Sequence, residues 1–282
     1  MTTTDARPQA EYDIQAMAET LYTDGIVGLK GAFSRPWVTE LREDLDAAFA
    51  EAKTRPNGTV GRGPERFYVE IHPEQIRGFV ELATHPWVVA MSEAVLGPDY
   101  EITELGFDTP FQNAKNQPWH RDFPAPDVTI NERKLITLAF NVTTVDVTEE
   151  MGPFQIAPGT QWEDGSAFKH GMFPPKSEHA RYEAMGQLKR PQMGDISCRT
   201  ALAIHRGTRH DSPTSRPVLV LGIDAPGGGN AERHDTAITR RFAETLPADL
   251  RRHLVCPVVD ELTPIEQKHT IEGLVMAADE DD

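Results

Sequence analysis

The hydrophobic period of the sequence changes at about Tyr100, and this change constrains the fold more than any other feature. From there to about residue 224, short segments with alternating apolar and polar residues are separated by proline and glycine. Leu135–Val142 and Val218–Ile223 are the clearest of them. Many short strands of this kind are typical of a double-sheet jelly roll. We therefore predict a mainly β fold with flanking helices, a double-stranded β-helix of the cupin-like type. Further strands are predicted at residues 26–30, 100–107, 154–157, 195–198 and 202–204.

Helical periodicity flanks this region on both sides. Trp37, Leu41, Leu45 and Phe49 recur at helical spacing after Ser34, a residue type that caps helix N-termini. Similar patterns predict further helices at residues 10–24, at 74–96 with a break at Pro86, and at 237–254 with a break at Pro247.

Length and composition favour one domain. A chain of 282 residues with 39% hydrophobic residues can bury one large core. Within residues 1–282 we expect a mostly helical N-terminal support at 1–99, a jelly-roll core at 100–224, and a C-terminal helical segment with an acidic tail at 225–282. Residues 163–192 interrupt the core without clear periodicity. Stretches of this length are typical of a functional lid or of disorder, and we predict a lid that orders when substrate binds.

Charge excludes several classes of partner. The chain has 28 basic and 44 acidic residues, a net charge of −16, so a nucleic acid or an anionic membrane is not an expected partner. The N-terminus lacks the pattern of a signal peptide, and no apolar stretch approaches the ~20 residues of a membrane span. We expect a cytoplasmic protein, whose oligomeric state the sequence leaves open. Cys198 and Cys256 have no disulfide or metal-site spacing and are expected to be small buried hydrophobic residues.

The candidate metal ligands are His120, Asp122 and His205. In extended backbone, His120 and Asp122 point to the same side because the period of a strand is two. Two neutral imidazoles and one carboxylate can hold a divalent iron on one face and leave the opposite face open. A His-x-Asp pattern is also common in solvated charge clusters, so by itself it leaves both interpretations open.

The surroundings of these residues form a longer pattern. Three blocks, Asn116–Phe123, Met151–Thr160 and Gly194–Gly207, are followed by Arg216. In order and spacing they resemble the iron(II)/2-oxoglutarate dioxygenases of the phytanoyl-CoA dioxygenase superfamily. Chains of that superfamily carry a His-x-Asp motif, a Gly-Pro...Pro-Gly-Ser-His turn, a Gly-Asp strand that leads to the distal histidine, and a downstream arginine. The matching motifs run from about residue 112 to 224.

The resemblance implies an enzyme with iron(II), 2-oxoglutarate and O2 as cofactors. His120, Asp122 and His205 would be the catalytic metal ligands, and turnover would couple decarboxylation of 2-oxoglutarate to oxidation of a C–H bond in a small organic substrate. Arg216 would pair its planar guanidinium with the far carboxylate of 2-oxoglutarate. Gln117 matches a glutamine that relatives use on the same co-substrate. Hydroxylation is the default outcome, while desaturation, epimerisation and ring formation remain open.

Departures from the family pattern affect secondary contacts. Thr160-Gln161 stands where many relatives have Ser-His, and Phe154 stands where several have a hydroxyl residue. The acid of the motif is retained as Asp122, whereas related halogenases replace it, so halogenation is disfavoured.

Substrate contacts are the least constrained part of the site. Four aromatic residues are candidates for the lining of a substrate pocket or, equally, for the core: Phe67, Tyr68, Trp119 and Phe123. Two functions of other classes remain alternatives. One is a metal-binding jelly roll with non-redox activity, such as a hydrolase or isomerase, and the other is a binding protein without catalysis.

Overall fold

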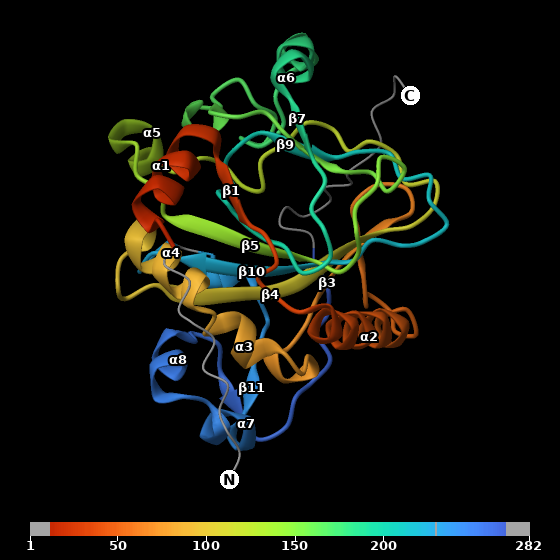
Figure 1. Cartoon of the computed structure of the whole chain (residues 1–282), viewed down its shortest axis with the longest axis vertical. Helices are drawn as coiled ribbons and strands as arrows, with labels where there is room; N and C mark the ends of the chain where they lie inside the picture. The colour runs from red at the N-terminus through yellow and green to blue at the C-terminus, as the bar shows by residue number, and fades with distance from the viewer. Residues whose placement is uncertain (1–11, 229, 269–282) are drawn as a thin grey trace.

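Two antiparallel sheets facing each other form the centre of the chain in the computed structural model, which describes residues 12–228 and 230–268 (Figure 1). The large sheet contains, in spatial order, β1 (Ile26–Leu29), β8 (Ile196–Arg199), β5 (Thr137–Thr143), β10 (Val218–Asp224), β4 (Glu101–Pro110), β3 (Arg66–Glu70) and β2 (Val60–Gly61). The small sheet contains β7 (Gln187–Lys189), β6 (Phe154–Ile156) and β9 (His205–Gly207). The predicted jelly-roll class is confirmed.

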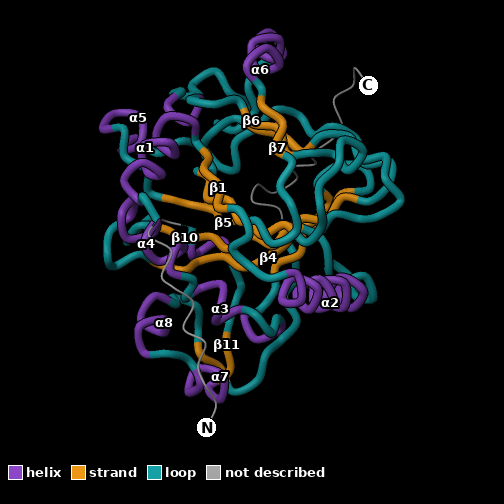
Figure 2. Tube along the Cα trace, in the orientation of Figure 1, coloured by secondary structure: helices purple, strands orange, loops and turns teal. Residues whose placement is uncertain are grey.

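Several helices lie on the outer side of the large sheet, whereas long loops and one further helix lie around the small one (Figure 2). The helices are α1 (Ile14–Asp24), α2 (Arg35–Ala52), α3 (Phe79–Ala83), α4 (Pro86–Leu96), α5 (Asp127–Glu132), α6 (His179–Met185), α7 (Arg240–Thr245) and α8 (Ala248–His253). Short 3-10 turns are η1 (Pro73–Gln75), η2 (Thr160–Trp162), η3 (Lys176–Glu178) and η4 (Ala231–Arg233), and a two-stranded parallel pair joins β11 (Ile238–Thr239) to β12 (Val258–Val259). No helix in the described ranges is long and apolar enough to cross a membrane.

Alternation along β5 separates the core from the interior space. Leu138, Phe140 and Val142 are buried in the main hydrophobic cluster beneath the helices. Ala139 and Asn141 face the space between the sheets, where they line a cavity. Burial of one face against helices stabilises the sheet, while the other face is left for function.

A β-bulge breaks the same alternation in β4. Gly222 pairs with Glu104, but Ile223 pairs with Ile102, so Thr103 has no opposite residue in the register. Strict alternation predicts that Ile102 and Glu104 share a face. Instead, the extra residue lets Ile102 join the core while Thr103 and Glu104 both line the cavity.

Other predictions require correction. The segment 202–204 is a turn and not a strand, because the Thr160 hydroxyl accepts a hydrogen bond from the Ile204 amide and holds the backbone there. Residues 163–192 contain η3, α6 and β7 and are therefore more regular than their lack of periodicity indicates. The predicted break at Pro86 is confirmed, since α3 ends before it and α4 begins with it, and proline is tolerated in a first turn. The acidic tail lies outside the described residues.

Candidate metal centre

Backbone pairing brings the three candidate ligands together. The amide of His120 donates to the carbonyl of His205 (3.0 Å), and the amide of His205 donates to the carbonyl of His120 (2.8 Å). The Asp122 amide bonds the carbonyl of Ala201 (2.9 Å), so residues 120–122 run antiparallel to the chain entering β9. One ligand atom from each of His120, Asp122 and His205 lies within 4.8 Å of the others. We call these three residues the triad.

Both imidazoles are oriented by backbone carbonyls. Nδ1 of His120 lies 2.8 Å from the Pro118 carbonyl, and Nδ1 of His205 lies 2.9 Å from the Ala203 carbonyl. A carbonyl only accepts, so each Nδ1 carries the proton and each Nε2 keeps a lone pair for a metal. Burial, and then the neighbouring His205 ring, lower the pKa of His120 to about 3. This histidine is therefore neutral at neutral pH, as a ligand must be.

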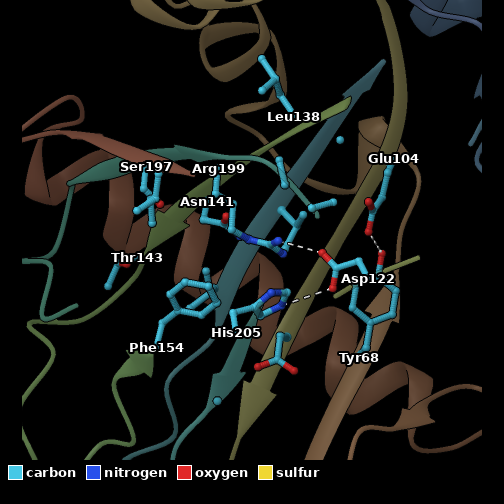
Figure 3. A pocket seen from close by; sticks show the side chains of 18 of the residues that line it. Tyr68, Glu104, Asp122, Leu138, Asn141, Thr143, Phe154, Ser197, Arg199 and His205 are labelled. Carbon is cyan, nitrogen blue, oxygen red and sulfur yellow. Dashed lines mark hydrogen bonds and ion pairs between the residues drawn. The ribbon is translucent and has the colours of Figure 1, made fainter. Parts of the chain in front are cut away.

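The carboxylate of the triad is held by an arginine. Oδ2 of Asp122 lies 2.7 Å from Nη1 of Arg199, and Oδ1 lies 3.4 Å from Nε2 of His205 (Figure 3). Burial alone would raise the pKa of Asp122, but Arg199 and His205 outweigh burial and hold this pKa well below its ordinary value. The carboxylate is ionised, and its Oδ1 faces the histidine. Sequence analysis did not identify Arg199, because no spacing rule links it to residue 122.

A cavity of about 820 Å³ opens beside the triad, between the two sheets. Its wall includes all three triad residues and four of the other predicted site residues, Gln117, Arg216, Tyr68 and Phe123. Asn230, Glu232, Arg233, His234 and Lys268 also line it, which shows that the segment after β10 contributes to the site. Sequence analysis assigned no function to that segment.

One region of the cavity wall is rich in buried arginine. Arg216 donates from Nε to the Met151 carbonyl and from Nη2 to the Gly152 carbonyl, both at 2.9 Å. Burial, and then the charge of Arg66, lower the pKa of Arg216 to about 10, so it stays protonated at neutral pH. Gly152 has φ of +62°, and a Cβ there would lie 2.4 Å from the Thr208 carbonyl, so this turn requires glycine.

Arg66 was missed by the sequence analysis. It is 2% exposed and donates to Asp108 (3.0 Å) and to the Thr208 carbonyl (3.0 Å). Its Nε is buried and has no hydrogen-bond partner among the described residues. The Asp108 carboxylate pairs with Arg66 and also offsets part of the lowering of the Arg216 pKa. The negative charge of this one acid is therefore shared by two guanidinium groups. This region of the cavity is therefore suited to an anionic group.

The remaining predicted residues divide into two groups. The Gln117 amide donates to the Arg62 carbonyl (3.1 Å) and accepts from the Gly207 amide (2.8 Å), so it braces the cavity wall. Phe67 and Trp119 do not lie among the residues that line the cavity. Phe67 precedes Tyr68 on the same strand, so its side chain points to the opposite face of the sheet, where it packs against Phe49. Trp119 packs against Tyr182 outside the small sheet.

Comparisons with known proteins give a family match and proteins of similar fold. The family model described as Phytanoyl-CoA dioxygenase (PhyH) matches residues 21–218. The fold is similar to that of the non-heme alpha ketoglutarate dependent epimerase SnoN from nogalamycin biosynthesis, with a TM-score of 0.57 and 19% identity over 74% of this chain and 81% of that one. SnoN in complex with Fe3+, alpha ketoglutarate and nogalamycin RO gives a TM-score of 0.60 and 19% identity, over 75% of this chain and 84% of that one.

A second protein has a similar fold. HygX from Streptomyces hygroscopicus, solved with nickel and 2-oxoglutarate bound, gives a TM-score of 0.55 and 16% identity over 74% of this chain and 86% of that one. A search of curated proteins found no match to the chain.

Proposed function

Because the chain belongs to the phytanoyl-CoA dioxygenase family, we propose that it is an iron(II)- and 2-oxoglutarate-dependent oxygenase that acts on a C–H bond of a small organic molecule. The observation that carries the proposal is the triad at the wall of a cavity of about 820 Å³. Proteins of similar fold are described with Fe3+ and alpha ketoglutarate or with nickel and 2-oxoglutarate.

The triad fits iron(II). Two neutral imidazoles and a carboxylate are the donor set of non-heme oxygenases that keep positions open for other ligands. His120 and His205 would bind through Nε2, since their Nδ1 atoms are engaged by carbonyls, and Asp122 would bind through Oδ1. When bound, iron(II) with 2-oxoglutarate and O2 supplies an oxidation coupled to the release of succinate and CO2.

The residues of this chain would position the co-substrate. Arg216 is fixed by two carbonyls and, with Arg66, offers positive charge to the far carboxylate of 2-oxoglutarate. Gln117 holds the backbone of Gly207, two residues after the distal ligand, and would contact the co-substrate from the wall. Tyr68 and Phe123 would contact the organic substrate.

Hydroxylation is the outcome we propose first. One observation favours a second outcome, inversion at a carbon centre, because SnoN is described as an epimerase. Comparing the stereochemistry of substrate and product separates the two. A non-redox hydrolase or isomerase and a binding protein without catalysis are the remaining alternatives. Both are contradicted if succinate forms only when iron(II), 2-oxoglutarate and O2 are all supplied.

The first prediction concerns the triad. His120→Ala, Asp122→Ala and His205→Ala should each abolish succinate formation and lower the iron content of the purified protein, since each removes one of three ligands. Asp249→Ala, exposed on α8 and not among the residues that line the cavity, is the control and should keep both. Metal analysis and succinate assays are the measurements. Wild-type iron content in all three variants would contradict the metal assignment.

The second prediction concerns Arg216. Arg216→Lys keeps the charge but loses the planar fork, and we expect about tenfold weaker 2-oxoglutarate binding. Arg216→Ala should weaken it by about a hundredfold, because a buried carboxylate loses its charged partner. Anaerobic 2-oxoglutarate titration of iron-loaded protein, followed by the visible band of the chelate, measures the affinity. The matched control is the exposed Arg240→Lys. Equal affinity in all variants would show that a cation other than Arg216 pairs with the far carboxylate of 2-oxoglutarate.

A further inference from the structure

The inner face of the large sheet carries hydrogen-bonding side chains where it faces the triad. Tyr68 on β3, Glu104 on β4, and Asn141 on β5 line the cavity together with Asp122 and His205 (Figure 3). Thr143, on the same strand face as Asn141, and Ser197, opposite Asn141 in the register, extend this polar surface. A substrate that reaches the triad must therefore contact polar groups on its other side.

Glu104 is placed in the cavity by the bulge in β4 and by two glycines. A Cβ on Gly222 would lie 2.8 Å from the Glu104 carboxylate, and a Cβ on Gly106 would lie 2.3 Å from the Tyr68 hydroxyl. Tyr68 donates a hydrogen bond to Oε1 of Glu104. Oε2 lies 4.0 Å from Nε2 of His234, beyond hydrogen-bond distance, and so keeps capacity to accept.

Asn141 presents a second acceptor. Its Oδ1 is buried and has no hydrogen-bond partner among the described residues. Buried acceptors in folded proteins are nearly always paired, so an atom like this one points to a donor supplied by water or ligand. Glu104 and Asn141 lie on strands that both pair with β10, so one molecule in the cavity can reach both.

We propose that the substrate is a small molecule rich in hydrogen-bond donors, with hydroxyl or ammonium groups, which Glu104 and Asn141 bind from the side opposite the triad. This inference rests on the proposed function and names its substrate class. An acyl chain or other apolar molecule would bury the Glu104 carboxylate and the Asn141 oxygen without donors, which disfavours it. Glu104 determines specificity, and Tyr68 positions its carboxylate.

Binding to the protein loaded with nickel(II) and 2-oxoglutarate tests the proposal without turnover. The probes are myo-inositol and glucosamine, which carry many donors, and cyclohexanone, a ring of similar size without donors. Ligand-detected NMR titration should show binding of at least one donor-rich probe and none of cyclohexanone. Glu104→Gln and Asn141→Leu should each weaken this binding about tenfold or more. Glu101→Gln, on the same strand but not among the lining residues described, should leave it unchanged.

Two results would overturn the proposal. One is that neither donor-rich probe binds, and the other is that Glu104→Gln and Asn141→Leu bind the probes as the wild type does. Tyr68→Phe, which keeps the ring and removes the donor to Glu104, provides a milder variant if Glu104→Gln fails to fold. A 2-oxoglutarate titration of the same preparations reports separately on the proposed function, since Glu104 and Asn141 are not assigned to the co-substrate.

Discussion

At the scale of single residues, the chemistry of the site depends on groups that hold the ligands. Asp122 has one oxygen toward His205 and the other on Arg199, which is itself largely buried. An arginine in this place keeps the carboxylate ionised and restricts how it can rotate. Groups that orient metal ligands in this way affect metal affinity although they do not touch the metal.

The third prediction follows for Arg199. Arg199→Gln should weaken metal binding by about ten- to a hundredfold, the usual effect of losing a group that orients a ligand. Arg199→Lys should recover part of the loss because it keeps the charge. Cobalt(II) titration, monitored by absorption, gives both the affinity and the ligand geometry. Unchanged affinity and an unchanged spectrum in Arg199→Gln would show that the ion pair serves only the fold.

At the scale of elements, local signals determine where the helices begin. The Ser34 hydroxyl accepts from the Trp37 amide (3.4 Å) at the N-terminus of α2, and Pro36 lies in the first turn. The buried face of α2 comes from Val38, Leu41 and Leu45, which join the main cluster. The capping residue and the face of this helix agree with the sequence prediction.

The fourth prediction concerns this cap. Ser34→Ala should lower the free energy of unfolding by about 1 kcal/mol, because one amide of the first turn loses its acceptor. Ser34→Asp should restore it, since aspartate is also a good cap. Urea denaturation of the variants measures the difference. A cap that contributes nothing would give three proteins with the same midpoint.

The segment after β10 is held to β3 by Glu70. This carboxylate accepts from the His234 ring (3.2 Å), the Asp235 amide (2.7 Å) and the Thr236 hydroxyl (3.0 Å). Burial alone would lower the pKa of His234, but the hydrogen bond to Glu70 and the charges of Glu104, Glu70 and Asp224 outweigh burial and raise it.

The fifth prediction is a pH dependence of stability. A raised pKa in the folded state means that the folded protein binds the proton of His234 more tightly than the unfolded chain does. The resulting stabilisation is fully present below the ordinary histidine pKa of about 6.5 and is lost as pH rises through the higher folded-state value. The stability difference between wild type and His234→Gln should therefore be larger at pH 6 than at pH 9 in urea denaturation. A difference that grows with pH would contradict the assigned direction.

At the scale of the whole molecule, residues 163–192 connect to the triad through Arg121. Its amide donates to the Met172 carbonyl (3.1 Å), and its Nη2 donates to the Glu163 carbonyl (2.9 Å). Tyr182 is buried and donates to the Glu163 carboxylate (2.8 Å). At the far end, residues 188–191 line the cavity. The segment is therefore anchored at several points, and its role as a lid remains a prediction.

Hydrogen exchange is the test of this lid. Amides of residues 163–178 should exchange faster than those of β10 in the protein without ligands, since few of them lie in regular structure. Addition of nickel(II) and 2-oxoglutarate should slow exchange in residues 188–191, which line the cavity. Protection of the whole segment equal to that of β10 before any addition would exclude a lid.

The sequence by itself determined the features that depend on neighbouring residues. Alternation in Leu135–Val142 predicted β5, and helical spacing after Ser34 predicted α2. Short motifs with fixed spacing indicated the family, and the family model matches residues 21–218. Iron, 2-oxoglutarate and O2, which were predicted from the same resemblance, agree with that family. These signals survive in one sequence because they arise from backbone period and from chemistry within a few residues.

Only the tertiary structure decided which distant side chains meet in the cavity. The choice of Tyr68 over Phe67 as a lining residue, and the exclusion of Trp119, depend on which face of each segment packs inward. Arg66, Arg199 and Glu104 reach the site through sheet register and one bulge. Register between strands far apart in sequence is set by the packing of the whole sheet, so no local pattern of residues can specify it.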